Sequence, residues 1–440
     1  MILLSFSARN HKSFRDEAVL DLVSPKLVTL QPKDGDWASV VYPLAGVFGG
    51  NATGKSALLD ALLYAFRAIR HSASSWQSSR TMHRAPFRLD GTHETASSAY
   101  TLDFVLDGRR HEYSFEVDAR GIKRERLRDV PSSRWRTLVD RAREGASAST
   151  KMHPSLKTMA DVTDRELILS RALLLDHPQL APIAEGMIRG FDIVLVKASH
   201  RAQRLAELTE SLAEGRVEFA DLQALLALAD VGVTEVGVEE EKVPEQFLRL
   251  LRGVNTENAE EPAEGRETSS DRGELDEDEL ELVARHLTFV HRGAAASTPP
   301  FSIDEESDGT IAWLAVAVPA LEALRRGSVL AVDEIDASIH PHLLDLLLGA
   351  FSDPSVNTWG AQLVFSSHES YVLSPMSQTR LEPEQVWFTD KDRDGAASLT
   401  CLADFPRHPD ANVAKRYLEG RYGGTPRLSP SLLAALVQSR

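Results

Sequence analysis

The chain has 440 residues, of which 42% are hydrophobic and 26% are charged, with a mean hydropathy of −0.22. It is too long for one ordinary core, so we expect two or three lobes, and no stretch approaches the ~20 apolar residues that a membrane span requires. The net charge of −16 is unevenly distributed, because 12 acidic and 2 basic residues lie between Asn255 and Leu282. Overall acidity therefore does not exclude contact with nucleic acid elsewhere.

The N-terminus and the single cysteine indicate the compartment. The opening MILLSFSARNHKSF places its apolar residues before its basic ones, the reverse of a secretory signal, which predicts a cytoplasmic protein. The lone Cys401 excludes an internal disulfide and most cysteine metal sites, and within SLTCL we expect it to be a packed thiol.

The first motif is a glycine-rich loop between an apolar run and a helical pattern. Val40–Phe48 (VVYPLAGVF) precedes GGNATGKS, and SALLDALLYAFRAIR follows with helical periodicity. The loop fits G-x-x-x-x-G-K-[ST], in which backbone N–H groups and a helix N-terminus surround phosphate oxygens. We expect Lys55 to pair with the β- and γ-phosphates of ATP and Ser56 to ligate Mg²⁺. The predicted nucleotide-binding residues are Gly49, Gly50, Asn51, Ala52, Thr53, Gly54, Lys55 and Ser56.

Alternating strands begin near Tyr100 and predict an antiparallel sheet, with a turn at Asp107-Gly108. Arginines crowd Arg120–Arg143 around Trp135. That segment is either a nucleic-acid or partner surface or an ordinary exposed sheet face, and both interpretations stay open. Residues 131–254 then read as a helical insertion, and 255–284 as an acidic, mobile insertion whose role the sequence does not assign.

The second half supplies a buried strand that ends in two carboxylates, Val329–Glu334. We expect Asp333 to hold Mg²⁺, and Glu334, on the opposite side of the strand, to orient or deprotonate the attacking water. In the next apolar strand, QLVFSSHES, His368 stands at the end, where an imidazole can donate to the γ-phosphate. Glu334, His368 and Lys55 are the predicted catalytic residues, and Ser56 and Asp333 the predicted metal ligands.

The sequence DKDRDG at Asp390–Gly395 opens like an EF-hand loop, but its twelfth position is Cys401 in place of glutamate. A Toprim-type acidic pair is a further alternative, although only about 70 residues follow His368. We favour a polar hairpin between QVWFT and ASLTCL.

These residues together resemble the ATP-binding-cassette-type heads of the SMC, RecF and OLD lineages. More narrowly, the chain resembles the AAA-type ATPases of the RloA/AbiLi abortive-infection family. The similarity includes SFSARNHKSFRDE, APFRLD, ESDGT, VDEIDASIHP, AQLVFSSHES and YLEGRYGGTP. It implies an α/β fold: a P-loop NTPase head with a mixed parallel core sheet, an antiparallel β-subdomain and a helical insertion. The expected segments are 1–130 and 285–405 for the two halves of the head, 131–254 and 255–284 for the insertions, and 406–440 for a C-terminal helical tail.

The resemblance also implies a homodimer, or a higher oligomer, that sandwiches ATP. One protomer supplies the P-loop, and the other supplies a helix N-terminus; the segment in that place is Ser307, Asp308, Gly309 and Thr310. The adjoining D-loop would be Asp336, Ala337 and Ser338. Two departures from the family pattern are expected. Relatives often have aspartate where this chain has Glu369, and no persuasive coupling glutamine is present, since Gln77 is a poor candidate and Arg88 lies nearer the expected position.

In such a family the ATPase would control a companion Toprim-type nuclease in antiviral defence, with no membrane partner. The alternatives are a RecF- or SMC-like DNA-binding ATPase of repair or chromosome maintenance and, less favoured, the nucleotide-binding subunit of a transporter.

Overall fold

The computed structural model describes residues 1–144, 147–157, 159, 162–195, 197–229, 232–242, 283–293, 299–406 and 412–424. These residues form two compact units, which we describe separately. The first unit joins Met1–Lys197 to Val316–Arg440, and the second is Ala198–Ala315. Most of the acidic segment 255–284 and the end of the predicted tail lie outside the described residues.

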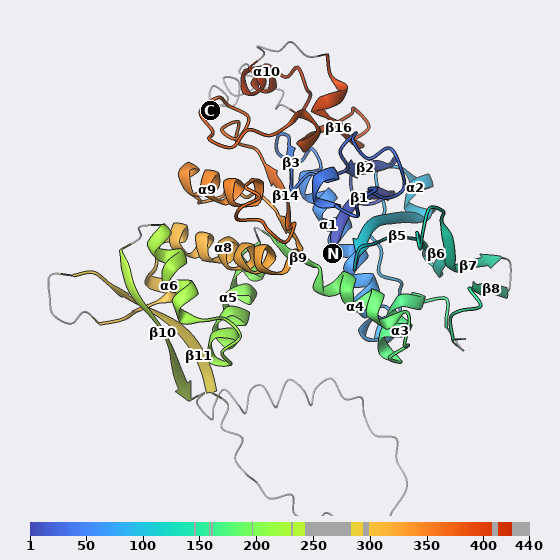
Figure 1. Ribbon diagram of the computed structural model, residues 1–440, viewed down its shortest axis with the longest axis horizontal. Helices are drawn as coiled ribbons and strands as arrows, with labels where there is room; N and C mark the ends of the chain where they lie inside the picture. Colours follow the sequence, from blue (N-terminus) through green and yellow to red (C-terminus); the bar gives the residue numbers. More distant parts are fainter. Residues whose placement is uncertain are drawn as a thin grey trace, which may run out of the picture. The chain divides into compact units, whose positions relative to one another are not determined.

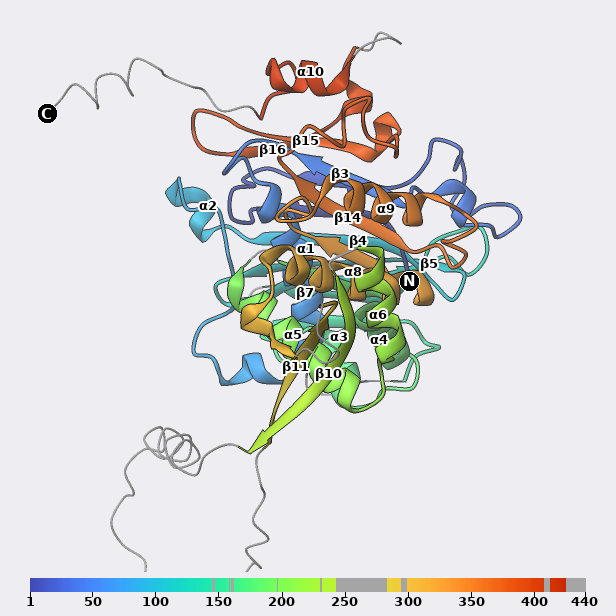
Figure 2. The same cartoon turned by 90° about the vertical axis from the view of Figure 1, so that its left-hand side faces the viewer.

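The central sheet of the first unit is built from both ends of the chain. Its strand order is β16-β15-β3-β14-β13-β9, and all neighbours run parallel except β15 and β16. Every residue of β3, β13 and β14 is buried, as expected for parallel strands covered on both faces. Figures 1 and 2 show β3 beside β14, although they are far apart in the sequence. The strands are β3 (Leu44–Phe48), β9 (Phe191–Val194), β13 (Val329–Val332), β14 (Gln362–Ser367), β15 (Val386–Lys391) and β16 (Ala397–Cys401).

A second sheet in this unit is antiparallel, in the order β2-β1-β4-β5-β6-β7-β8. Buried and less buried residues alternate along β5, which matches its period-two sequence. Asp107 and Gly108 both have positive φ, 49° and 74°, so this turn closes the β4–β5 hairpin as predicted. The strands are β1 (Ile2–Arg9), β2 (Ala18–Asp21), β4 (Ser98–Leu106), β5 (Arg109–Asp118), β6 (Gly121–Asp129), β7 (Arg136–Glu144) and β8 (Ser147–Met152).

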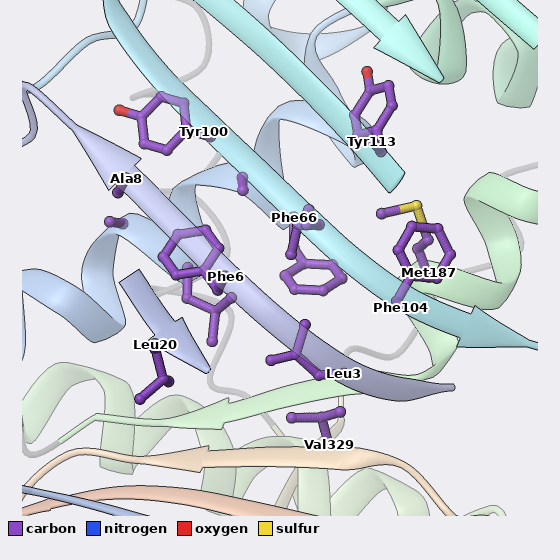
Figure 3. Packing of buried hydrophobic residues seen from close by; sticks show 14 of the residues in the cluster. Leu3, Phe6, Ala8, Leu20, Phe66, Tyr100, Phe104, Tyr113, Met187 and Val329 are labelled. Carbon is purple, nitrogen blue, oxygen red and sulfur yellow. The ribbon is translucent and has the colours of Figure 1, made fainter. Parts of the chain in front are cut away.

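Helix α1 (Lys55–His71) contributes to the core cluster that spans both sheets. Its buried leucines, alanines, Phe66 and Ile69 recur at helical spacing. Phe66 stacks on Phe191 with ring centroids 4.0 Å apart. Figure 3 shows Phe66 among buried side chains that come from several strands and from α4, which are Leu3, Phe6, Ala8, Leu20, Tyr100, Phe104, Tyr113, Met187 and Val329. The other helices of the unit are α2 (Gly91–Thr95), α3 (Ile168–Leu174), α4 (Ala181–Arg189), α9 (Pro341–Ser352) and α10 (Val413–Leu418).

The second unit packs two helices against a small antiparallel sheet. β10 (Val233–Lys242) pairs with β11 (Val283–His291), and β11 pairs with β12 (Phe301–Ser302). The helices are α5 (Ala198–Ala213) and α6 (Phe219–Leu228), and the unit boundary at Ala315/Val316 falls inside α8 (Asp308–Arg326). Short 3₁₀ turns occur at Ala38–Val40, Ser75–Ser78, Ile303–Glu305, Pro383–Gln385 and Leu402–Asp404.

The observed α/β architecture, with a mixed core sheet and a separate antiparallel sheet, confirms the predicted fold class. The range 131–254 is less helical than expected, since β7, β8, β9 and β10 all lie within it. Within β10, Val236 and Val238 give a short period-two signal, which directly follows the leucine-rich helix α6. In the described parts of the chain, no helix has both the length and the apolar character needed to span a bilayer.

Candidate functional site

The glycine-rich loop joins the end of β3 at Phe48 to the start of α1 at Lys55, as the sequence predicts. A Cβ atom at Gly49 would lie 2.4 Å from Thr389 Oγ1, so this position accepts only glycine. Gly54 has φ of 122°, and a Cβ there would lie 2.8 Å from the Cβ of Ala397. The first turn of α1 carries neither a capping side chain nor an acidic residue. Its N–H groups and its positive dipole end therefore suit an anion.

Lys55 lies folded against this loop. Its Nζ donates to the carbonyls of Gly49 at 2.6 Å and Gly50 at 2.9 Å, and the residue is buried. Burial lowers the pKa of Lys55, and this effect is opposed by the nearby carboxylates, of which Glu334 contributes most. An ammonium group at the mouth of a phosphate-sized loop, facing acidic residues, can neutralise a bound polyanion.

Asp333 connects the loop to the second half of the chain. It follows the last residue of β13, and its backbone N–H donates to Val194 at 2.8 Å. Its Oδ1 accepts hydrogen bonds from Ser56 at 3.0 Å and Ser366 at 2.6 Å. A hydroxyl and a carboxylate are hard oxygen donors of the kind that Mg²⁺ prefers. Among the described residues no group of three or more His, Cys, Asp or Glu side chains is placed to hold a metal ion.

The sequence pattern predicted that Glu334 lies on the strand, but the structure places it beyond the end of β13. β13 ends at Val332, and Glu334 occupies a turn with φ of 50°, in the left-handed region. A non-glycine residue there costs on the order of 1 kcal/mol and persists only where its surroundings hold it. The Glu334 N–H donates to Ser366 Oγ at 2.8 Å, and that same hydroxyl donates to Asp333. Ser366 thus ties the two acids together. Sequence reasoning missed it, and the only signal was the serine pair that ends the strand QLVFSS.

His368 faces the turn that follows Glu334. Its Nε2 is 3.8 Å from Asp336 Oδ2, and Ser338 in the same turn has φ of 65°. Within the described ranges, the buried atoms Asp336 Oδ1 and His368 Nδ1 have no hydrogen-bond partner. Unsatisfied polar atoms are rare in folded proteins and mark a place where a ligand or water can bind. The turn therefore brings His368 and the predicted D-loop residues Asp336–Ser338 together. The Glu369 N–H donates to Ser367 Oγ at 3.1 Å.

The segment Ser307–Thr310 belongs to the second unit and begins α8, as its sequence predicts. Ser307 Oγ accepts the Thr310 N–H at 3.1 Å and bonds the Thr310 hydroxyl at 2.9 Å, so Ser307 caps the helix. Ser307 and Asp308 are exposed and Thr310 is buried. Gly309, between them, is partly exposed.

Gln77 and Arg88, the two candidates for the coupling residue, differ in their surroundings. Gln77 Nε2 donates to the Ser72 carbonyl at 2.5 Å, which fastens the end of α1. Arg88 is exposed. The structure gives neither residue a contact to the acid pair.

The arginine-rich segment 120–143 is largely neutralised by acidic neighbours. Trp135 lies against Arg128, whose guanidinium carbon is 4.2 Å from the ring centroid. Arg141 is fully buried beside Glu125, at 3.7 Å. These pairings favour the sheet-face interpretation over a nucleic-acid surface. The paired residues are Arg124–Asp140, Arg128–Glu112, Arg136–Asp129, Arg141–Glu125 and Arg143–Asp118.

The segment DKDRDG is a hairpin turn. It joins β15 to β16, and Asp392 Oδ1 accepts the N–H groups of Asp394 at 2.9 Å and Ala396 at 2.8 Å. A carboxylate used in this way closes its own turn, which agrees with the polar hairpin that the sequence favoured.

Comparison with known proteins identifies a family and solved structures, one of which is described here. A family model described as "AAA domain, putative AbiEii toxin, Type IV TA system" matches residues 44–374, from β3 to beyond His368. The solved SMC head domain from Thermotoga maritima aligns at 11% identity with a TM-score of 0.38, covering 91% of this chain and 99% of that one. No curated protein matches the chain.

Proposed function

Because the chain belongs to the family of AAA domains described as a putative AbiEii toxin of a type IV TA system, we propose that it is a Mg²⁺-dependent ATPase that works as a nucleotide-driven, dimerising switch. The observation that carries this proposal is the contact of Ser56 with Asp333 at 3.0 Å beside the P-loop. Two halves of the chain meet there to present one hydroxyl and one carboxylate. That is the donor set of a nucleotide-bound Mg²⁺ ion.

The residues of the site divide the work of ATP hydrolysis. Lys55 exchanges its carbonyl partners for the β- and γ-phosphate oxygens, because these carry more negative charge. Ser56 and Asp333 would hold Mg²⁺, which would supply charge neutralisation at the phosphates. Glu334 orients the attacking water and accepts its proton, and the left-handed turn sets the direction of its carboxylate. His368 donates to the γ-phosphate, with Asp336 close to its imidazole.

Closure of the switch involves a second copy of the chain. In this proposal, Ser307–Thr310 of one protomer meets the γ-phosphate bound by the other, and Asp336–Ser338 lie along the shared edge. The start of α8 supports this role, because Ser307 offers a hydroxyl and Gly309 permits close approach, although the carboxylate of Asp308 in the first turn opposes an anion there. ATP would then stabilise the dimer, and hydrolysis would release it.

The switch would control an effector nuclease in an abortive-infection system. The family description names a putative toxin, which supports a role in a defence system that stops growth of the infected cell. The narrower resemblance to the RloA/AbiLi ATPases suggests that the effector is a Toprim-type nuclease. Neutralisation of the arginine-rich segment argues against the alternative in which this chain itself grips DNA.

Hydrolysis and dimerisation of the purified protein test the proposal. With Mg²⁺ and ATP the wild type should turn over, whereas Glu334→Gln should bind ATP without hydrolysing it and elute as a dimer. Glu94→Gln, the same change at an exposed site on α2, serves as the matched control. A wild-type protein that does not bind ATP would refute the proposal. Tight, salt-sensitive binding of duplex DNA by this chain alone would refute the effector role and support a repair function.

A further inference from the structure

The first two residues of the P-loop are held by a segment from the far end of the chain. This segment, Tyr417–Gly424, is called the strap below. The Gly424 carbonyl accepts the N–H of Gly50, and the Gly424 N–H donates to Asp390 Oδ1 at 3.0 Å. The Tyr417 side chain lies close to the backbone of Gly49. The loop is therefore held from outside at the Gly50 peptide group, with Tyr417 beside Gly49.

The strap is seated on the strand that lies beside the P-loop strand. Phe388 of β15 stacks with Tyr422, with centroids 4.8 Å apart, and with Tyr417, with centroids 5.5 Å apart. Phe388 is also the register partner of Phe48, the last residue before the loop. Its neighbour Thr389 bonds Thr53 of the loop, hydroxyl to hydroxyl, at 2.7 Å. The strap and the P-loop thus share one rigid support.

Close approach of the strap depends on two glycines. Gly423 and Gly424 have φ of 75° and 67°, in the left-handed region. A Cβ at Gly424 would lie 2.5 Å from the Thr389 carbonyl oxygen and 3.1 Å from the Gly49 Cα. A Cβ at Gly423 would lie 2.7 Å from Asp390 Oδ2. A side chain at either position would push the strap away from the loop.

The strap also fixes the direction of the peptide group that receives Lys55. In a trans peptide the N–H and the preceding C=O point in opposite directions. Since the Gly50 N–H is bound by Gly424, the Gly49 C=O faces the other way, where Lys55 Nζ donates to it at 2.6 Å. Without the strap this peptide group could rotate, and the loop would have to be ordered when a ligand binds.

We propose that the strap is a positioning element of the nucleotide site, in which Gly424 and Tyr417 hold the P-loop in its phosphate-binding shape. This inference rests on the proposed ATPase function. It predicts that the strap acts on affinity for ATP and leaves the rate of the bound complex nearly unchanged, because the acids Asp333 and Glu334 do not contact it.

Equilibrium titration with a fluorescent ATP analogue and steady-state kinetics with MgATP test the strap in the full chain. Gly424→Ala should raise Kd and KM for ATP about tenfold, because it breaks the hydrogen bond from the Gly50 N–H and leaves the P-loop less ordered. The value of kcat should stay within about twofold of the wild type. Gly35→Ala is the matched control, since Gly35 has φ of 77° and no atom within 4 Å of its would-be Cβ. A loss of folded protein would instead lower apparent kcat at constant KM.

A second pair of variants tests the strap if Gly424→Ala does not fold. Tyr417→Phe removes the hydroxyl near Gly49 and keeps the ring on Phe388, whereas Tyr422→Phe removes a hydroxyl from the other stacked ring. Weaker ATP binding by Tyr417→Phe alone supports the proposal. Normal affinity in both Gly424→Ala and Tyr417→Phe would overturn it while leaving the ATPase proposal intact. A wild type that does not bind ATP would refute both.

Discussion

Replacement of Ser366 by alanine should slow ATP hydrolysis without weakening ATP binding. The Ser366 side chain is fully buried and contacts both acids of the site, accepting the Glu334 N–H at 2.8 Å and donating to Asp333 at 2.6 Å. It does not contact Lys55 or the glycines of the loop. The change therefore isolates the placement of the acids from the capture of phosphate.

The size of the effect follows from the two bonds that are lost. A hydrogen bond to a carboxylate contributes about 1.5–3 kcal/mol and a neutral one about 0.5–1.5 kcal/mol. The Glu334 N–H would be left buried without its partner in a left-handed turn, so the turn would relax. If roughly half of the summed energy is expressed in the transition state, kcat should fall about 5–50-fold. KM for ATP should change less than about threefold.

Steady-state phosphate release at saturating MgATP measures this prediction, and the melting temperature monitors folding. Ser367→Ala is the matched control, because this neighbouring serine is equally buried but bonds Glu369. A Ser366→Ala protein that hydrolyses ATP at the wild-type rate would refute the reasoning that Ser366 positions the acid pair. A large rise in KM with unchanged kcat would also contradict it.

Three further predictions concern other parts of the chain. Gly309→Arg should lose ATP hydrolysis and ATP-dependent dimerisation, because the bulky charged side chain blocks the start of α8. Titration should show that ATP still binds, and size-exclusion chromatography should show that the dimer is lost. Normal hydrolysis by this variant would make the segment an ordinary loop. Arg141→Met should lower the free energy of unfolding by about 3–5 kcal/mol, because it leaves the Glu125 carboxylate buried without its charge partner. In urea denaturation, the double variant with Glu125→Gln should recover part of this loss. Burial raises the pKa of Asp60, but hydrogen bonds from His11 and Lys12 outweigh it and lower that pKa from 3.8 to about 2. This stabilisation is present above pH 3.8 and is lost as the pH falls towards 2, so the deficit of Asp60→Asn in urea titrations should shrink over that range, and a constant deficit would contradict the assignment.

The parts of the fold that local sequence determines were predictable. The P-loop can be recognised because its glycines, lysine and serine lie within eight consecutive residues. The apolar strand before it and the helix after it are also marked by patterns of neighbouring residues. Asp333 could be paired with Ser56 because the carboxyl ends of the parallel strands of one sheet lie at the same edge. The alternation that marked the antiparallel strands likewise needs only a few residues.

The parts that depend on distant contacts were not predictable. The strap joins Gly50 to Gly424, and nothing near either residue indicates the other. Ser366 reads as one polar residue at a strand end, and its role appears only once the Glu334 turn is seen beside it. The arginine-rich segment stayed ambiguous because its carboxylate partners, such as Glu112 and Asp118, come from other strands.

The place of β3 in its sheet has a consequence for biosynthesis. Both of its neighbours, β14 and β15, come from the second half of the chain, beginning at Gln362 and Val386. At translation rates of about 5–20 residues per second, the ribosome needs on the order of 15–60 s to pass from β3 to β14. During that time the apolar strand that carries the P-loop has no neighbour in the sheet. A nascent chain arrested before β14 would expose β3. Capture of β3 by a chaperone and its cleavage by protease should therefore end only when the last third of the protein has emerged.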